Sequence, residues 1–495
     1  MIHLINMPFA SIFHPALALG LIKSQLKEAG IKNHVFDLNL MFAGMIGFAS
    51  YEAIAMFKGI RIQVSEWLFS KQAWEEDCGF SEEEFLSICK KELPDIPKVP
   101  DSVEWLKKVR STAVPAFLQK AVNKLPAYGQ PTVVGFSCSF FQTVSSLALG
   151  RLIKEAYPDV KLVFGGSCFH GEMGEELIQK VPWIDAVSIG EADDVIVPLF
   201  QALLDGRSPS NLQGILYRNE NGDVKFDKSA SPVSKEVLEV VPDADFDDYF
   251  GEINKIGLNI PAFRRGQYLP FEGSRGCWWG QKHHCKFCGL NPTGINYRAK
   301  TGERVYGTIA NYMQKYPVNR LQATDNNLTS KHIKTLFFKL KESPFRDKLS
   351  IFFEVKVNLK REQVRAISEG GVRFVQPGIE SLSTHLLDLL KKGTTALQNV
   401  YFLKLCREYN IYVIWNNLVR IPGEREEDYK EMENLIPKIL HLAPPHTPKG
   451  TVLIECHRFS PYFSEKGKWL ENVRPLSWYD ALFPAAKIDL SRVAY

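Results

Sequence analysis

The chain has little net charge, too few cysteines to pair them all, and no long apolar run. Its 495 residues carry 60 Lys+Arg against 56 Asp+Glu, a formal charge of only +4, so bulk electrostatics favour no nucleic-acid partner. Nine cysteines are an odd number, which disfavours a secreted disulfide framework and indicates a cytoplasmic protein. No stretch of about 18 residues lacks charged or strongly polar groups, so no membrane partner is expected. The apolar N-terminus lacks the basic region of a signal peptide.

The first half of the sequence has the pattern of an α/β fold. With 45% hydrophobic residues, the chain can bury two or three domain cores. Short apolar runs alternate with helical periodicity, which predicts a parallel, doubly wound, Rossmann-like sheet. The expected strands are residues 2–5, 34–38, 132–136, 161–164 and 186–189, and a hairpin is expected over 214–227. This predicts a first domain over residues 1–228 and a linker over 229–262.

The alternation breaks between residues 40 and 125, where helix-like segments predict an inserted helical block. Two interpretations of this insert stay open. It either packs on the sheet as a lid, or it serves as a docking surface or a cover for a bound cofactor.

The second half predicts a partial (β/α)6 barrel. Six apolar segments are separated by helical stretches, too few for an eight-unit barrel. The expected strands are residues 268–272, 320–324, 351–355, 374–378, 412–415 and 452–456. The barrel is placed at residues 263–440, and residues 441–495 hold its last strand and the C-terminal region.

The most specific motif is a C-x7-C-x2-C cluster formed by Cys277, Cys285 and Cys288. A zinc site would need a fourth ligand, for which His283 and His284 are candidates, whereas an iron-sulfur cluster can leave one iron open. The motif directly follows the first barrel strand, and the carboxyl ends of barrel strands carry the reactive groups of such folds. The position therefore favours iron-sulfur over structural zinc.

Four stretches together resemble the cobalamin-binding radical S-adenosylmethionine (SAM) enzymes, specifically peptide maturases of the RiPP maturation radical SAM protein 1 type. They are CWWGQKHHCKFCGLN, FVQPGIES, WNNLVRIPGE and HRFSPYF. The first gap of seven residues departs from the superfamily's usual C-x3-C-x2-C spacing. Members of this kind usually continue past a point like Tyr495, which leaves truncation of the C-terminus open.

The resemblance implies a [4Fe-4S] cluster on the three cysteines and SAM bound by polar residues at the strand ends. Arg298 has the geometry to bind a carboxylate bidentately. For each single residue an ordinary loop or cap contact is the alternative. The implied SAM-binding residues are Phe287, Arg298, Asp325, Asn326, Glu354, Lys356, Glu380, Ser381 and Asn417.

The first sheet is similar to cobalamin-binding domains, because small residues end its strands and no G-x-G-x-x-G follows the first strand. The implied cobalamin-binding residues are Asn6, Pro8, Ser137, Ser139, Gln142, Gly165, Gly166, Ser167, Gly190 and Glu191. The D-x-H-x-x-G motif that supplies an axial imidazole is absent, so base-off binding without a histidine ligand is expected. His170 is interpreted as a surface loop residue.

The implied function is C-methylation of an unactivated carbon in a ribosomally synthesised precursor peptide. One SAM methylates the cobalt, and a second yields a 5'-deoxyadenosyl radical that takes a hydrogen from the substrate. A reductant such as flavodoxin or ferredoxin is the second expected partner, and no acid/base dyad is nominated. Two alternatives stay open: a cobalamin-binding radical enzyme that catalyses a crosslink, epimerisation or rearrangement, and, more distantly, a zinc-binding interaction protein.

Overall fold

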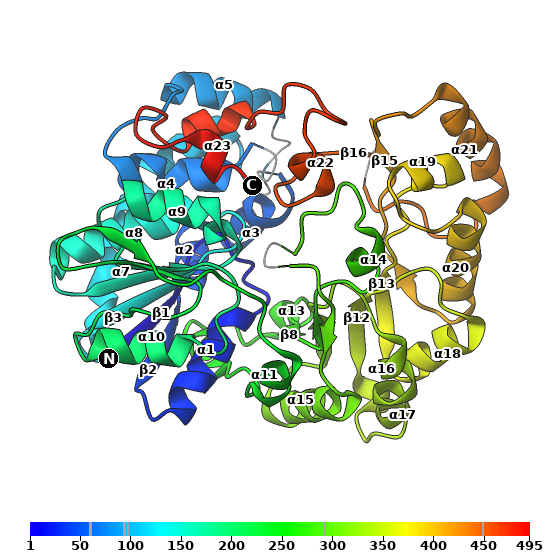
Figure 1. Ribbon diagram of the computed structural model, residues 1–495, viewed down its shortest axis with the longest axis horizontal. Helices are drawn as coiled ribbons and strands as arrows, with labels where there is room; N and C mark the ends of the chain where they lie inside the picture. Colours follow the sequence, from blue (N-terminus) through cyan, green and yellow to red (C-terminus); the bar gives the residue numbers. More distant parts are fainter. Residues whose placement is uncertain (59–61, 93–95, 97–98, 292–293, 448–449) are drawn as a thin grey trace. The chain divides into compact units, whose positions relative to one another are not determined.

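The computed structural model describes residues 1–495 except 59–61, 93–95, 97–98, 292–293 and 448–449. The chain divides into two compact units (Figure 1). Unit 1 comprises Met1–Val233, Val240–Gly266 and Arg474–Tyr495, and unit 2 comprises Ser234–Glu239 and Gln267–Val473. The expected linker and the expected C-terminal region are therefore each divided between the two units.

Unit 1 contains a seven-stranded sheet of order β2-β1-β3-β4-β5-β6-β7. The first five strands along the chain pair in parallel, and β6 and β7 form the predicted antiparallel hairpin at one edge. The predicted α/β sheet is confirmed, with boundaries that differ by only one or two residues. The strands are β1 (Ile2–Asn6), β2 (Asn33–Asp37), β3 (Val133–Ser137), β4 (Lys161–Gly165), β5 (Ala186–Ser188), β6 (Ile215–Arg218) and β7 (Val224–Phe226).

Helices cover both faces of this sheet, as a buried parallel sheet requires. Alternate residues of a strand point to opposite faces, so Leu4 joins one core with Leu19 and Phe200, while Ile5 joins the other with Leu147. The helices of the alternating pattern are α1 (Leu17–Glu28), α8 (Thr143–Ala156), α9 (Glu172–Lys180) and α10 (Ile196–Leu204). Two further helices follow the hairpin, α12 (Asp247–Lys255) and α13 (Pro261–Arg264).

The inserted block packs on the sheet. Its Phe42, Trp67 and Phe117 are fully buried in the same core as Phe136 and Phe164 of the strands. Among the described residues, no single helix has the length and apolar character to cross a membrane; α2 and the following helical segment would do so only as a pair bent by 115°. The insert's helices are α2 (Leu38–Ile46), α3 (Phe48–Glu52), α4 (Val64–Trp74), α5 (Glu82–Glu92), α6 (Ser102–Lys108) and α7 (Val114–Lys124), with π-helical turns at Ala53–Lys58 and Val109–Ala113.

The end of the chain belongs to unit 1. Helix α23 (Leu490–Val493) contacts α9, and Leu482 and Phe483 are buried in the unit 1 core. The indole Nε1 of Trp74, on the insert, donates a hydrogen bond of 2.7 Å to the Leu482 carbonyl oxygen. The last 22 residues therefore stabilise the first sheet rather than the barrel.

Unit 2 contains a parallel five-stranded sheet of order β14-β13-β12-β11-β8. The sixth expected strand is present as β16, but it pairs with β15 rather than with β14. An isolated bridge between Glu380 and Asn417 extends the edge of the sheet toward β15. The strands are β8 (Leu269–Phe271), β11 (Arg320–Ala323), β12 (Ser350–Glu354), β13 (Val372–Gln376), β14 (Tyr412–Val413), β15 (Leu418–Val419) and β16 (Val452–Leu453).

Helices between these strands complete the βα repeat of a partial barrel. A capping box at Thr395 begins α20, and at the start of α21 the Asp428 carboxylate accepts from the Arg425 N–H, as expected where the first backbone N–H groups need acceptors. The helices of unit 2 are α14 (Gly280–His283), α15 (Gly302–Lys315), α16 (Ser330–Lys334), α17 (Leu336–Lys341), α18 (Arg361–Glu369), α19 (Thr384–Leu389), α20 (Ala396–Glu408), α21 (Glu426–Ile439) and α22 (Pro461–Ser464). A further helix, α11 (Lys235–Val240), begins in this unit.

Candidate functional site

The three cysteines of the C-x7-C-x2-C motif lie in one loop of unit 2, which follows β8. The ends of this loop, β9 (Ser274–Arg275) and β10 (Arg298–Ala299), pair as antiparallel strands. Gly276, directly before the first cysteine, has φ +75°, and a Cβ there would overlap the Asn296 carbonyl oxygen. Only glycine adopts this positive φ without strain and has no Cβ to clash, so the turn before Cys277 requires glycine.

A second segment, Leu390–Gly393, packs against the cysteine loop and forms hydrogen bonds with it. The Lys286 N–H donates to the Leu390 carbonyl oxygen (3.1 Å), and the Trp279 indole donates to the Lys391 carbonyl oxygen (3.1 Å). A Cβ at Gly393 would overlap the Trp279 ring. Trp279 therefore packs between the cysteine loop and Leu390–Gly393.

The thiols lie in a basic environment. Burial raises the pKa of the Cys285 thiol, and Lys392 and Lys356 oppose that rise. Burial likewise raises the pKa of Cys288 to about 11, again opposed by Lys392. Since iron is bound by the thiolate, the two ammonium groups favour the form of the cysteines that a cluster needs.

The donor set fits a cluster better than a single ion. Among the residues that the structure describes, no three His, Cys, Asp or Glu side chains converge closely enough to hold one metal ion. Zinc collects its ligands on one ion, whereas three thiolates of a [4Fe-4S] cluster bind three different irons. The Nε2 of His284 lies 2.9 Å from the Cys288 carbonyl oxygen, and the His283 ring lies 4.6 Å from the Trp279 ring. Neither histidine joins the cysteines as a fourth zinc ligand.

Charged side chains gather beside this loop at the carboxyl ends of β12 and β13. The Lys392 Nζ lies 3.3 Å from Glu380 Oε1, and the Lys356 Nζ donates to the Lys392 carbonyl oxygen (2.5 Å) and lies 3.7 Å from the centre of the Trp279 ring. Burial, with a smaller effect of Glu380, raises the pKa of Glu354 to about 7. Burial and Lys392 lower the pKa of Lys356 to about 8. These groups could bind a zwitterion, since both signs of charge are present.

Two more of the predicted SAM-binding residues adjoin this charged group. Asn417 pairs with Glu380 through the backbone bridge, and its side-chain Oδ1 is buried without a hydrogen-bond partner among the residues that the structure describes. The Phe287 ring lies 5.5 Å from the Lys392 Nζ. An unpaired buried acceptor is costly, so Asn417 fits a ligand that donates a hydrogen bond.

The structure gives the remaining predicted SAM-binding residues other surroundings. Asp325 is 1% exposed and accepts hydrogen bonds from the Gly273 N–H (2.7 Å) and the Ser274 hydroxyl (2.8 Å), and burial raises its pKa to about 7. Ser381 is fully buried, with its hydroxyl 3.6 Å from the Met432 sulfur. Asp325 thus holds the backbone at the start of the cysteine loop, and the Ser381 hydroxyl also accepts a hydrogen bond from the Ser383 N–H (3.1 Å).

The last two predicted SAM-binding residues also have partners outside the charged group. Asn326 donates to Asn291 Oδ1 (2.8 Å), and Arg298 Nε donates to the Asn296 carbonyl oxygen (3.3 Å). Arg298 lines a cavity of unit 2 together with Lys356. Both residues therefore contact the part of the cysteine loop that leads into β10.

Sequence reasoning missed Lys392. Its side chain is 12% exposed, and although burial disfavours its charge, Glu380 and Cys285 outweigh that effect and raise its pKa. The residue belongs to a short Lys-Lys-Gly run after α19, more than 100 positions beyond Cys277. Such a run is usually a solvated loop, and no local pattern distinguishes this one.

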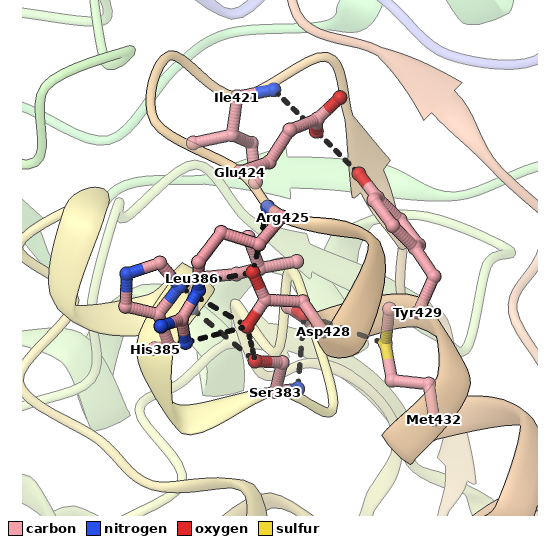
Figure 2. A network of polar contacts seen from close by, with 10 residues as sticks. Ser383, His385, Leu386, Ile421, Glu424, Arg425, Asp428, Tyr429 and Met432 are labelled. Atoms are coloured by element: carbon pink, nitrogen blue, oxygen red, sulfur yellow. Dashed lines mark hydrogen bonds and ion pairs between the residues drawn. The ribbon is translucent and has the colours of Figure 1, made fainter.

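A polar network anchors the I-P-G-E loop of the motif around residues 421–424 (Figure 2). Buried Asp428 accepts hydrogen bonds from His385 Nδ1 (2.9 Å), the Ser383 hydroxyl (2.8 Å) and the Arg425 N–H (2.9 Å). Glu424 accepts from the Ile421 N–H (2.8 Å) and from the Tyr429 hydroxyl. The network ties the beginnings of α19 and α21 together, so this loop has a defined conformation next to β15.

In unit 1, three of the predicted cobalamin-binding residues are interior. Asn6 donates to Asp37 Oδ1 (2.9 Å) and accepts from Gln142 Nε2 (3.0 Å). The carbonyl oxygen of Pro8 accepts a hydrogen bond from the Ser145 hydroxyl (2.5 Å). Asn6 and Gln142 are each 2% exposed. This buried network therefore supports the conformation of the loops that follow β1 and β3.

The other predicted cobalamin-binding residues form an accessible edge. Ser137, Gly165, Gly166, Ser167 and Gly190 are at least partly exposed at the ends of β3, β4 and β5. Small side chains let a flat ligand approach the backbone at the carboxyl edge of a parallel sheet, so this edge fits a corrin ring.

The three residues flanking this edge have different exposures. Ser139 is exposed, and its hydroxyl donates to Gln142 Oε1 (2.9 Å). Glu191 accepts from the Val233 N–H (2.9 Å) and so holds the chain after the hairpin. The interpretation of His170 as a surface residue is wrong, because it is 9% exposed; the turn before α9 folds it inward.

A model of the radical SAM superfamily matches residues 271–436. An uncharacterised methyltransferase of Pyrococcus horikoshii is 25% identical over 305 residues, which cover 60% of this chain and 62% of the relative. The anaerobic magnesium-protoporphyrin IX monomethyl ester cyclase of Rubrivivax gelatinosus is 25% identical over 356 residues, covering 68% of this chain and 59% of that enzyme. The chain thus spans about 60% of the length of these curated relatives.

The fold also matches a solved structure. The radical SAM methyltransferase TsrM from Kitasatospora setae, solved with cobalamin and a [4Fe-4S] cluster bound, superimposes with a TM-score of 0.62 and 16% identity, over 93% of this chain and 73% of TsrM. This likeness concerns the fold alone. Residues 271–436 thus match the radical SAM superfamily, and the α/β fold of the chain is similar to that of TsrM.

Proposed function

We propose that the protein is a cobalamin-dependent radical SAM C-methyltransferase that acts on an unactivated carbon of a ribosomally synthesised precursor peptide. One observation carries the proposal: Cys277, Cys285 and Cys288 share one loop at the carboxyl end of a barrel strand, next to the charged group of Glu354, Lys356, Glu380 and Lys392. A cluster and an amino acid-like cofactor need these two kinds of groups side by side.

The chain's own residues hold and shield the cofactors. The three thiolates bind the cluster, the charged group with Asn417 orients the amino and carboxylate groups of SAM, and the small-residue edge of unit 1 receives cobalamin in the base-off state. When bound, these groups supply the radical that removes hydrogen from carbon and the methyl group that replaces it. The protein contributes orientation and exclusion of water.

The peptide substrate is the most specific part of the proposal. It is supported by the four motif stretches of the sequence, and the reductant, a flavodoxin or ferredoxin, by the need to reduce the cluster. The relatives' names support methyl transfer, since the first is called a methyltransferase and TsrM is one.

The test is cofactor analysis of protein purified without oxygen. We expect wild type to hold about four irons and four sulfides and to retain added cobalamin. The triple variant Cys277→Ala, Cys285→Ala, Cys288→Ala should lose the iron and keep the corrinoid. Cys456→Ala, outside the loop, serves as the control and should keep both. One zinc per chain and no colour would refute the proposal in favour of a zinc-binding interaction protein.

A second candidate has a specific observation behind it: the match to the magnesium-protoporphyrin ester cyclase covers 68% of this chain. By its name, that enzyme closes a ring. A cobalamin-binding radical enzyme that catalyses a crosslink, epimerisation or rearrangement is therefore the rival. Mass spectrometry of the product separates the two, because only methylation adds the mass of one methylene.

A further inference from the structure

Unit 2 contains a cavity of about 760 Å³ that shares only Arg298 and Lys356 with the residues predicted to bind SAM. Its wall is formed by the strand β10 and the start of α15, by the loop after β11 with α16, and by the loop after β12. Trp278 of the cysteine loop also lines it. Its volume lies within the range of small-molecule sites, about 300 to 1,000 Å³.

The wall carries charge of one sign. Five of its residues are cationic, and none of its described lining residues is Asp or Glu. The cationic residues are Lys235, Arg298, Lys300, Lys331 and Lys356. Cations that share a concave wall attract anions, because the low-dielectric surroundings concentrate the field.

Acidic side chains that do not line the cavity balance part of this positive charge. The Lys300 Nζ lies 3.4 Å from Glu272 Oε2, and Glu239 accepts a hydrogen bond from the Thr301 N–H (2.8 Å). Lys235 and Lys331 are exposed and form no ion pair with any residue that the structure describes. The cavity therefore keeps an excess of positive charge.

This charge makes the cavity unsuited to SAM as a whole. SAM carries a sulfonium and an ammonium group against one carboxylate, so like charges would repel it. The acidic side chains Glu354 and Glu380 do not line the cavity. Lys356 lines it and also lies over Trp279 beside the cysteines. The cavity thus adjoins the site where a radical would form.

We propose that this cavity binds an oxyanion of the methyl acceptor, so that the substrate presents carboxylate or phosphate groups close to the reacting carbon. This inference rests on the proposed function, and a peptide acceptor would use acidic side chains here. The cavity could admit a short acidic segment or a small metabolite, and it would reject a strongly basic one. Lys331 and Lys235 recognise the anion's charge, and Lys356 connects it with the cluster loop.

Calorimetric titration of the intact protein tests the proposal with tri-glutamate, tri-glutamine and inorganic pyrophosphate. The variants are Lys331→Glu and Lys235→Glu. Lys334→Glu is the matched control, since Lys334 is exposed on the same helix α16 but does not line the cavity. We expect wild type to bind tri-glutamate and not tri-glutamine. Each cavity variant should weaken binding about tenfold and the control less than about twofold.

Binding of pyrophosphate alone, lost in the same variants, would assign the oxyanion to a phosphate-bearing acceptor and still support the cavity. Equal binding of tri-glutamine, no binding of either anion, or equal losses in Lys334→Glu would overturn the proposal. Iron content and reductive cleavage of SAM, measured on the same samples, separate the two hypotheses. A wild type that binds tri-glutamate but lacks iron would refute the proposed function and leave the cavity assignment intact.

Discussion

The carboxyl edge of the sheet in unit 1 differs from that in unit 2 in the side chains that follow its strands. In unit 1 the accessible residues are glycines and serines, and the polar groups of Asn6, Asp37 and Gln142 are buried beneath them. In unit 2 the edge carries charged groups and thiols, with Glu380 paired to Lys392. The same parallel architecture thus has an edge of small neutral residues in one unit and a charged edge in the other.

The largest effect is expected from a variant that removes the cation paired with Glu380 in unit 2. Lys392→Met leaves Glu380, whose side chain is 14% exposed, without its cation. Loss of one partner of a buried pair costs about 3 to 5 kcal/mol; we expect about 3 kcal/mol here, in the free energy of unfolding of unit 2. SAM binding should weaken at the same time. Urea denaturation and equilibrium dialysis measure the two effects.

The control for this variant is Lys391→Ala, because Lys391 is exposed and contributes its carbonyl oxygen rather than its side chain to the site. Its stability should stay within about 0.5 kcal/mol of wild type. If Lys392→Met behaved like this control, the charged edge would have no role in holding the site.

The next prediction tests whether unit 1 needs small residues at the carboxyl edge of its sheet. Gly166 has φ +97°, and a Cβ there would overlap the Cys138 carbonyl oxygen. We expect Gly166→Ala to cost about 3 kcal/mol of unfolding free energy, since both backbone strain and a steric clash oppose it. It should also release cobalamin, which gel filtration with absorbance detection would show.

Gly30→Ala is the matched control in unit 1. Gly30 has φ +73°, but a Cβ at this position would have no atom within 4 Å, so only the backbone cost of about 1 kcal/mol applies. Retention of cobalamin by Gly166→Ala with normal stability would mean that this edge tolerates side chains.

The smallest effect concerns Glu66, an insert residue that accepts the N–H groups of Thr143 (2.9 Å) and Val144 (2.8 Å) at the start of α8. Burial raises the pKa of Glu66 from 4.5 to about 7. A raised carboxyl pKa means that the folded state holds the proton more tightly. Its contribution to stability is therefore complete below pH 4.5 and is lost as the pH rises through 7.

We expect the free energy of unfolding of wild type to fall by roughly 2 to 3 kcal/mol more than that of Glu66→Gln between pH 4.5 and 7. Urea denaturation at both pH values measures the difference. Glu83→Gln, an exposed position on the same insert, should leave the wild-type pH dependence unchanged. A Glu66→Gln profile that matches wild type would show that Glu66 is ionised in the fold throughout this range.

Prediction from the sequence succeeded where the signal is local. Strand β2 was expected over residues 34–38 and is found at Asn33–Asp37, because alternation of apolar residues depends on neighbours in the chain. The strand expected over 452–456 is reduced to Val452–Leu453, and its partner Leu418–Val419 was not expected. Pairing of such short strands depends on contacts between distant segments, which periodicity does not encode.

The same limit applies to the site. Ser381 and Glu380 are neighbours after β13, yet the serine faces Met432 in the interior while the glutamate meets Lys392. The resemblance implied both residues as ligands, but Glu380 lies beyond the end of β13 and has φ +58°, so the loop and not the strand sets the direction of the two side chains. Lys392 was missed because its role exists only through the fold of Leu390–Gly393 against the cysteine loop.

By itself, the sequence determined the two parallel α/β units and the single loop that carries all three cysteines, since periodicity and motif spacing act over short distances. Only the tertiary structure decided which polar residues meet. It placed Asp325 and Gln142 in the interior, brought Lys392 to the cysteines, returned residues 474–495 to unit 1 and lined one cavity with five cationic residues and no described acidic one. These outcomes depend on side-chain direction and on contacts between segments far apart in the chain.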